Sequence, residues 1–296
     1  RSLPERHARA QAPATAMKIC EIQGRGDSTM APTTTVTTDG VVYAAFLDTA
    51  PFGFFMQDPA CDGDATTSDG VFVYVPKGVA VTVNAGQKVR VSGRAKEYMG
   101  LTEILVSDGG VEVTGTADVP APTTLDLPAN VTAAQALLEA HEGMRVRLAA
   151  LKAIGGTDAH GEVPTIDAAA GIEHLLGGAL DGRKMILVGP GQWPVVAQGD
   201  TLRDVVGPLD YTFGEYKVDM PDWTAVGRTP GGRQPDTIAP SGADELTAAT
   251  FNVENLFDEI DDPGKEDTEG TYFPRSHAEY LAFVDRRATA IADRLG

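Results

Sequence analysis

The stretches GQKVRVSGRAKEYMG (residues 86–100) and GDTLRDVVGPLDYTFG (residues 199–214) decide how this sequence is interpreted. Near the end of each stretch a Tyr stands two or three residues before a final Gly, and in each stretch the last two glycines stand seven residues apart. A repeat of this kind predicts two related modules in tandem. The alternative is a chance likeness in a chain that has 33 glycines.

Short strand-like runs surround both copies of the repeat. In the first half they recur about every ten residues with turn residues between them, which is typical of a small barrel or sandwich. The runs are 18–23, 33–46, 53–57, 70–75, 88–93 and 101–106, then 144–151, 184–188, 201–206 and 214–218. The first segment with helical periodicity is 132–141, with Thr132 as its expected N-cap. We therefore predict a mainly β protein.

Composition divides the chain further. We expect a flexible arm over residues 1–16, modules over 17–117 and 118–220, and a Pro/Gly-rich linker over 221–245. Residues 246–296 hold one strand-like run and one amphipathic helix, Ser276–Leu295, whose apolar residues recur at intervals of three and four.

The charge pattern narrows the functions that this chain can have. The formal net charge is -18, and only the first thirty residues carry a positive balance, +2. A protein that holds nucleic acid by counterion release needs clustered Lys and Arg, so any phosphate chemistry here would depend on a metal ion. No apolar run of eighteen residues occurs, and we expect no membrane partner.

The stretch TFNVENLF (residues 250–257) resembles the first motif of the endonuclease/exonuclease/phosphatase superfamily. Members of that family have a four-layered α/β sandwich and hydrolyse phosphoester bonds with a divalent metal. The resemblance implies that Asn252 is a catalytic residue that orients water and phosphate, with Glu254 as a second polar catalytic residue. It implies Mg²⁺ or Mn²⁺ as the cofactor. It also implies that residues 246–296 are only the first strand and helix of that sandwich.

A longer part of the chain resembles bacterial extracellular nucleases that carry an OB-like region before the catalytic domain. The match rests on EIQG (21–24), TTDGVV (37–42), GFFMQD (53–58), TSDGVFVY (67–74) and LDYTFG (209–214). It implies two OB-like barrels in front of an incomplete α/β sandwich. It also implies secretion, hydrolysis of DNA or RNA, and the rest of the nuclease domain as a partner. We expect this chain alone to be inactive. The alternative is a non-catalytic region that binds nucleic acid or another partner.

An acidic loop and two cysteines form a second group of candidate residues. The carboxylates of Asp58, Asp62, Asp64 and Asp69 could wrap a calcium ion, or they could bond their own backbone in an exposed loop. Cys20 and Cys61 would form a disulfide if the 18–23 run passes beside this loop, which suits an extracellular protein. The alternative is two buried thiols.

Aromatic residues in both modules are the candidates for stacking on nucleic-acid bases. OB-like modules bind single strands through aromatic side chains beside a basic groove. Packing in the protein core is the competing interpretation, and the acidic charge of both modules favours it. The candidates are Phe54, Phe55, Phe72, Tyr74, Tyr98 and Tyr211.

Overall fold

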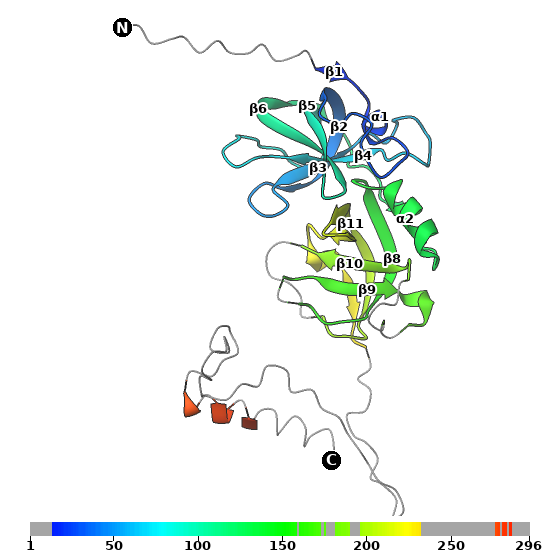
Figure 1. Ribbon diagram of the computed structural model, residues 1–296, viewed down its shortest axis with the longest axis vertical. Helices are drawn as coiled ribbons and strands as arrows, with labels where there is room; N and C mark the ends of the chain where they lie inside the picture. Colours follow the sequence, from blue (N-terminus) through cyan, green and yellow to red (C-terminus); the bar gives the residue numbers. More distant parts are fainter. Residues whose placement is uncertain are drawn as a thin grey trace, which may run out of the picture. The chain divides into compact units, whose positions relative to one another are not determined.

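The computed structural model describes residues 14–158, 160–172, 175, 181–189, 196–231, 276–278, 280–282 and 284–285. Two regions of mainly β structure follow each other along the chain (Figure 1). The first region contains β1 (Thr15–Ala16), α1 (Ile19–Gln23), β2 (Thr35–Phe46), β3 (Gly53–Gln57), β4 (Gly70–Tyr74), β5 (Gln87–Tyr98) and β6 (Leu101–Thr116). The second contains β7 (Thr123–Thr124), α2 (Val131–Glu139), β8 (Arg145–Ala153), β9 (Val163–Asp167), η1 (Ala168–Ala170), β10 (Lys184–Val188), β11 (Thr201–Thr212), β12 (Glu215–Asp219), η2 (Trp223–Ala225) and β13 (Gly227–Thr229).

Both sheets close in the same order. In the first, the strands run β2-β3-β4-β6-β5 and β5 pairs back onto β2; in the second they run β8-β9-β10-β12-β11 and β11 pairs back onto β8. The third and fifth strands of each barrel, β4 with β6 and β10 with β12, are parallel, and the other barrel pairs are antiparallel. This is the strand order of an OB-fold. The chain therefore holds two OB barrels in tandem.

Side chains that point inward from the strands fill the interior of each barrel. In β3, Phe54 and Met56 point into the first barrel, whereas Phe55 lies on its outer side, because successive side chains of a strand face opposite ways. The second barrel has its own interior cluster, which includes Leu151 and Leu187. Each barrel thus has a separate core.

A short helix precedes the first barrel strand in both halves. We predicted a strand over residues 18–23, but these residues form α1, with Lys18 as its N-cap. The backbone N–H of Lys18 donates to the Glu21 carboxylate (2.8 Å), and Gly24, at φ 76°, closes the helix. The pattern of these six residues is compatible with a strand and with a short helix. The helix forms here because it buries the side chains of Ile19, Cys20 and Ile22 together.

The second helix, α2, begins one residue before the predicted segment. Its N-cap is Asn130, whose side chain accepts a hydrogen bond from the N–H of Ala133 (2.9 Å). Among the described residues, no helix has both the length and the apolar content needed to cross a bilayer.

The predicted ends of the N-terminal arm and of the linker differ from those in the structure. Thr15–Ala16, placed in the flexible arm, form β1 and pair in parallel with Val36–Thr37. The start of the predicted linker, 221–245, is also structured, because β13 pairs antiparallel with residues 201–203 of β11. The Pro/Gly-rich composition of residues 221–245 gave no sign of this three-residue strand, which is stabilised by its pairing with β11. Of the predicted strand and helix in 246–296, only residues from 276 to 285 are described, in part, and all but the first of these are helical.

Candidate functional site

The outer face of the first barrel carries an aromatic cluster. Phe55 lies 4.8 Å from Phe72 and 6.2 Å from both Tyr43 and Phe46, measured between ring centroids. Phe55 and Phe72 are at most 2% exposed. Tyr211 of the second barrel is half-buried against the same cluster. The face of β3 and β4 is therefore an interface between the two barrels.

Polar contacts fix this interface. The hydroxyl of Tyr43 donates to the carbonyl oxygen of Gly143 (2.6 Å), and the N–H of Arg145 donates to the side-chain oxygen of Gln57 (3.1 Å). Gly143 fits because a Cβ there would come within 2.9 Å of the Val71 backbone. The backbones approach so closely that only glycine is tolerated.

This packing decides which predicted aromatics can reach a ligand. The face of the second and third strands is a common ligand surface of OB-folds, and in the first barrel the second barrel covers it. Phe54 fills the barrel interior, and Phe55 and Phe72 are buried between the barrels. Tyr74 and Tyr211 are half-buried, and Tyr98 is 52% exposed. Packing thus accounts for Phe54, Phe55 and Phe72, which do not reach the surface.

Two equivalent hairpin tips remain at the surface. Strands β5 and β6 are joined by Met99-Gly100, and β11 and β12 by Phe213-Gly214. All four residues have positive φ, between 53° and 91°, as in a type I′ turn. Met99 is 56% and Phe213 is 81% exposed. A Cβ on Gly100 would come within 2.4 Å of the Tyr211 ring, so the first tip packs against the second hairpin.

Each tip has a lysine beneath its aromatic side chain. The Lys96 ammonium lies 4.7 Å from the ring centroid of Tyr98, and the Lys217 ammonium lies 5.7 Å from that of Phe213. Both lysines are also ion-paired, Lys96 with Glu103 (2.7 Å) and Lys217 with Glu162. The tips therefore present apolar and aromatic surface with little unbalanced positive charge.

A buried carboxyl group, which our sequence analysis did not single out, lies at the same interface. Glu142 is 1% exposed, and its Oε1 accepts a hydrogen bond from the N–H of Thr102 in the other barrel (2.9 Å). Burial, followed by the charge of Glu139, raises the pKa of Glu142 to about 9. The side chain is therefore protonated at neutral pH. No local pattern in the sequence marks it, because its burial depends on a contact between residues forty positions apart.

In the acidic loop (residues 58–70), carboxylates accept hydrogen bonds from backbone N–H groups of the same loop. Asp62 accepts from the N–H of Asp64 (2.8 Å), and Asp64 accepts from the N–H of Thr66 (2.9 Å) and pairs with Arg25. Asp58 accepts from the N–H of Ala60 (3.2 Å). Within the described part of the chain, the carboxylates of this loop do not gather around one point as a three-ligand group.

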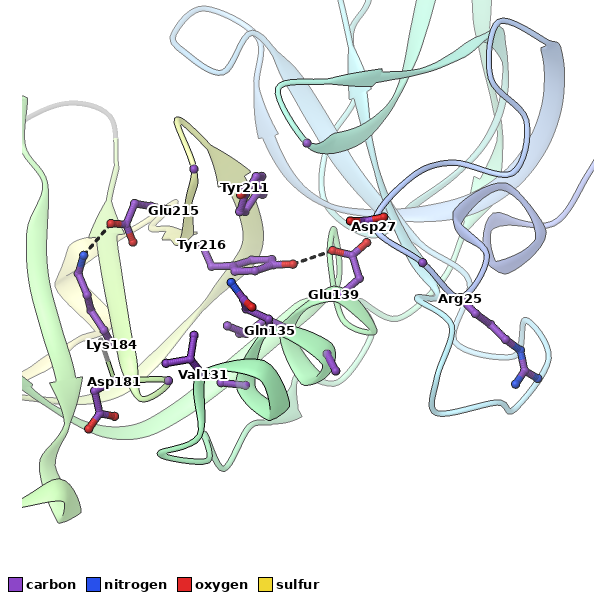
Figure 2. Close-up of a pocket in the computed structure, with 17 residues that line it drawn as sticks. Arg25, Asp27, Val131, Gln135, Glu139, Asp181, Lys184, Tyr211, Glu215 and Tyr216 are labelled. Atoms are coloured by element: carbon purple, nitrogen blue, oxygen red, sulfur yellow. Dashed lines mark hydrogen bonds and ion pairs between the residues drawn. The ribbon is translucent and has the colours of Figure 1, made fainter. Parts of the chain in front are cut away.

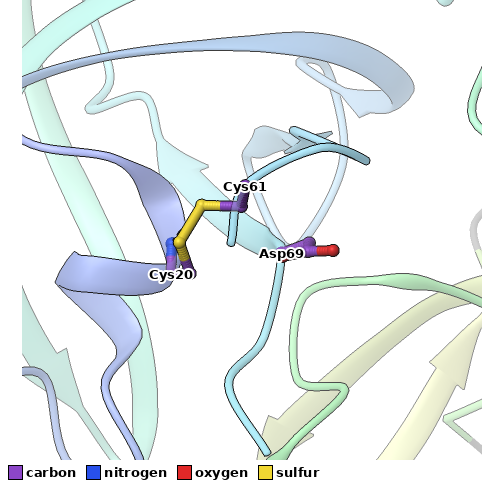
Figure 3. Close-up of side chains that lie close together, drawn as sticks. All are labelled: Cys20, Cys61 and Asp69. Carbon is purple, nitrogen blue, oxygen red and sulfur yellow. A yellow bond between two sulfur atoms is a disulfide. The ribbon is translucent and has the colours of Figure 1, made fainter. Parts of the chain in front are cut away.

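Cys20 and Cys61 form a disulfide beside this loop, with an S–S distance of 2.07 Å (Figure 3). The carboxylate of Asp69 lies within 4.8 Å of both sulfur atoms, but sulfurs joined to each other are not metal ligands. Burial, and then the charges of Asp62 and Asp58, raise the pKa of Asp69 to about 6. The predicted catalytic residues Asn252 and Glu254 lie outside the described residues.

A groove lies between the barrels, with a volume of about 690 Å³. Its walls come from the loop after α1, from α2 and from the two hairpin tips, with Tyr211 and Tyr216 between them (Figure 2). Within the described part of the chain, the groove is a second candidate surface for a ligand, and it adjoins the tips at Gly100 and Gly214.

Comparisons with known proteins give one family model and several distant structural similarities. A domain of unknown function, DUF8508, matches residues 127–229, which include the whole second barrel. No curated protein matches the chain. Among solved structures, it is similar to the second OB-fold domain of replication protein A from Methanococcus maripaludis (16% identity, 34% of this chain and 95% of that one, TM-score 0.24).

Two further solved structures cover a larger share of the chain. Fission yeast Pot1 with ssDNA is 11% identical over 70% of this chain and 87% of that one, with a TM-score of 0.25. A murine DNA-binding protein with ds DNA is 11% identical over 67% and 97%, with a TM-score of 0.27. The strand order of each barrel, rather than these matches, carries the OB assignment.

Proposed function

We propose that residues 14–231 are a non-catalytic region that contacts single-stranded nucleic acid through its two hairpin tips, as part of a secreted, metal-dependent nuclease. One observation carries the binding role: two equivalent hairpins present Tyr98, Met99 and Phe213 at the surface. Hairpins between the fourth and fifth strands are ligand-binding loops of OB-folds. Bases stack on exposed aromatic rings whatever their sequence.

That the protein is a secreted nuclease is proposed from the resemblance to bacterial extracellular nucleases. The motif with Asn252 and Glu254 supports hydrolysis with Mg²⁺ or Mn²⁺. The Cys20–Cys61 disulfide supports an oxidising, extracellular location. Calcium binding by Asp58, Asp62, Asp64 and Asp69 remains a prediction, to be tested by calcium titration.

The charge of the chain determines how strongly the affinity for nucleic acid would depend on salt. The net charge is -18, and the lysines beneath the tips are already ion-paired. Few phosphates would be neutralised, so stacking would supply most of the affinity. We therefore expect weak binding with a shallow dependence on salt, a slope of about -1 or less in magnitude in a log–log plot.

Fluorescence anisotropy with a labelled dT oligonucleotide, at low and high salt, tests the proposal. Phe213→Ala should weaken binding about tenfold, because one stacked base contributes roughly 1–3 kcal/mol. Val113→Ala is the matched control. Val113 is 47% exposed and pairs with Val89, which lies nine residues, or about 30 Å of strand length, along β5 from Tyr98 of the first tip.

Three results would overturn the proposal: no binding at low salt, equal binding by Phe213→Ala and the unmutated chain, or a steep salt dependence. Incubation of DNA with the chain and Mg²⁺ tests the non-catalytic assignment separately. We expect intact DNA, and cleavage would contradict that assignment.

A further inference from the structure

The groove between the barrels has an electrostatic character unlike that of the hairpin tips. Asp27 and Glu139 both line one end of the groove, where the charge of Asp27 acts on Glu139 (Figure 2). Glu97 is close enough for its charge, together with that of Asp27, to act on Glu139. Burial, followed by these two carboxylates, raises the pKa of Glu139, although the hydrogen bond from Tyr216 opposes the rise.

The basic residues that line the groove do not neutralise this end. Arg25 pairs with Asp64, so its side chain is directed away from Asp27 and Glu139 (Figure 2). Lys184 pairs with Glu215 at the opposite end (2.7 Å). Among the described residues, Asp27, Glu97 and Glu139 have no Lys or Arg in an ion pair. Within the described part of the chain, these three carboxylates therefore have no ion-paired counter-charge.

Aromatic rings form the middle of the groove. The rings of Tyr211 and Tyr216 lie 4.7 Å apart, inclined at 60°. The Tyr216 hydroxyl donates to Oε2 of Glu139 (2.7 Å), which ties the aromatic pair to the acidic end. Helix α2 also contributes small side chains, Ala134 and Ala136, to the groove lining. A ligand that suits both regions needs a positive charge and a flat face.

We propose that this groove binds an arginine side chain of a basic peptide segment in a partner protein. The guanidinium would lie between Asp27 and Glu139, with its plane against the Tyr211–Tyr216 pair. Arginine meets these requirements better than lysine because its planar fork donates two parallel hydrogen bonds and stacks on aromatic rings. A phosphate-bearing ligand would be repelled by the same carboxylates. The inference is independent of nucleic-acid binding at the hairpin tips.

The test uses the whole chain and a fluorescein-labelled peptide of alternating Gly and Arg, read by anisotropy at low salt. Matched peptides carry lysine or the neutral isostere citrulline in place of arginine. We expect the arginine peptide to bind at least about tenfold more tightly than the citrulline peptide, because the ionic hydrogen bonds are lost. The lysine peptide should bind with intermediate affinity.

Two isosteric variants test whether the arginine peptide binds in the groove. Glu139→Gln keeps an oxygen to accept from Tyr216, and Asp27→Asn lies on an exposed loop, so neither should unfold the chain. Each should weaken arginine-peptide binding about fivefold to tenfold. Glu112→Gln, an exposed residue of β6 outside the groove, should leave binding unchanged.

The proposal is overturned if the citrulline peptide binds as tightly as the arginine peptide, if lysine is preferred, or if Glu139→Gln and Asp27→Asn bind like Glu112→Gln. Phe213→Ala separates this inference from the proposed function. It should weaken dT binding and leave arginine-peptide binding within about twofold, since Phe213 does not line the groove.

Discussion

Phe55→Ala should lower the free energy of unfolding by about 3–5 kcal/mol and loosen the contact between the barrels. Phe55 is fully buried, and its ring packs on Tyr43, Phe46 and Phe72. Truncation removes the buried area of the ring and leaves a cavity that neighbouring side chains fill only in part. Urea denaturation followed by circular dichroism measures the loss. Because the cluster joins the two barrels, the effect should also extend beyond the first one.

Hydrogen exchange measures that second effect. The backbone N–H groups of Thr102 and Arg145 donate across the interface, to Glu142 and Gln57 respectively. Phe55→Ala should speed exchange at these two amides more than at amides between β5 and β6. Phe54→Ala is the matched control, because the neighbouring ring points into the barrel and should weaken the β5–β6 amides instead. Equal changes at all amides in Phe55→Ala would contradict a selective role at the interface.

The tandem barrels could be predicted from the sequence, because local signals mark them. The bounds of β3 and β10 match the short apolar runs predicted as strands, and the glycines that recur at a fixed spacing predicted the repeat of two modules. By contrast, β9 was not predicted. Its five residues, Val163–Asp167, contain a proline and follow a loop, so they show no distinct alternation.

The distribution of the aromatics could not be predicted, for a different reason. Alternation in GFFMQ places Phe54 and Phe55 on opposite faces of β3, but it does not say which face is inside a barrel and which meets a second one. Both are buried. Phe213, the most exposed large apolar side chain of the described residues, was not a candidate although it lies in the quoted repeat. The fixed glycine after it was the available signal, since it marks a turn tip.

Glu142→Gln should make the stability of the chain less dependent on pH. Glu142 gains a proton on folding, because its pKa is about 9 in the folded chain against an ordinary value of 4.5. Its contribution is therefore complete below pH 4.5 and declines as the pH rises toward 9, where burying the ionised form costs most. Glutamine has the same shape, and its side-chain oxygen can accept from the N–H of Thr102, but it never ionises.

Relative to the unmutated chain, Glu142→Gln should have about equal stability near pH 5 and be more stable by about 2–4 kcal/mol at pH 9. Denaturation curves at intervals across this range give the difference directly. A carboxyl whose charge is not among those that act on Glu142, such as Asp69 with a pKa of about 6, titrates in both proteins and cancels from it. The exposed control Glu112→Gln should give a flat difference. A flat difference for Glu142→Gln as well would mean that water reaches this carboxylate, and that the interface next to Thr102 is open.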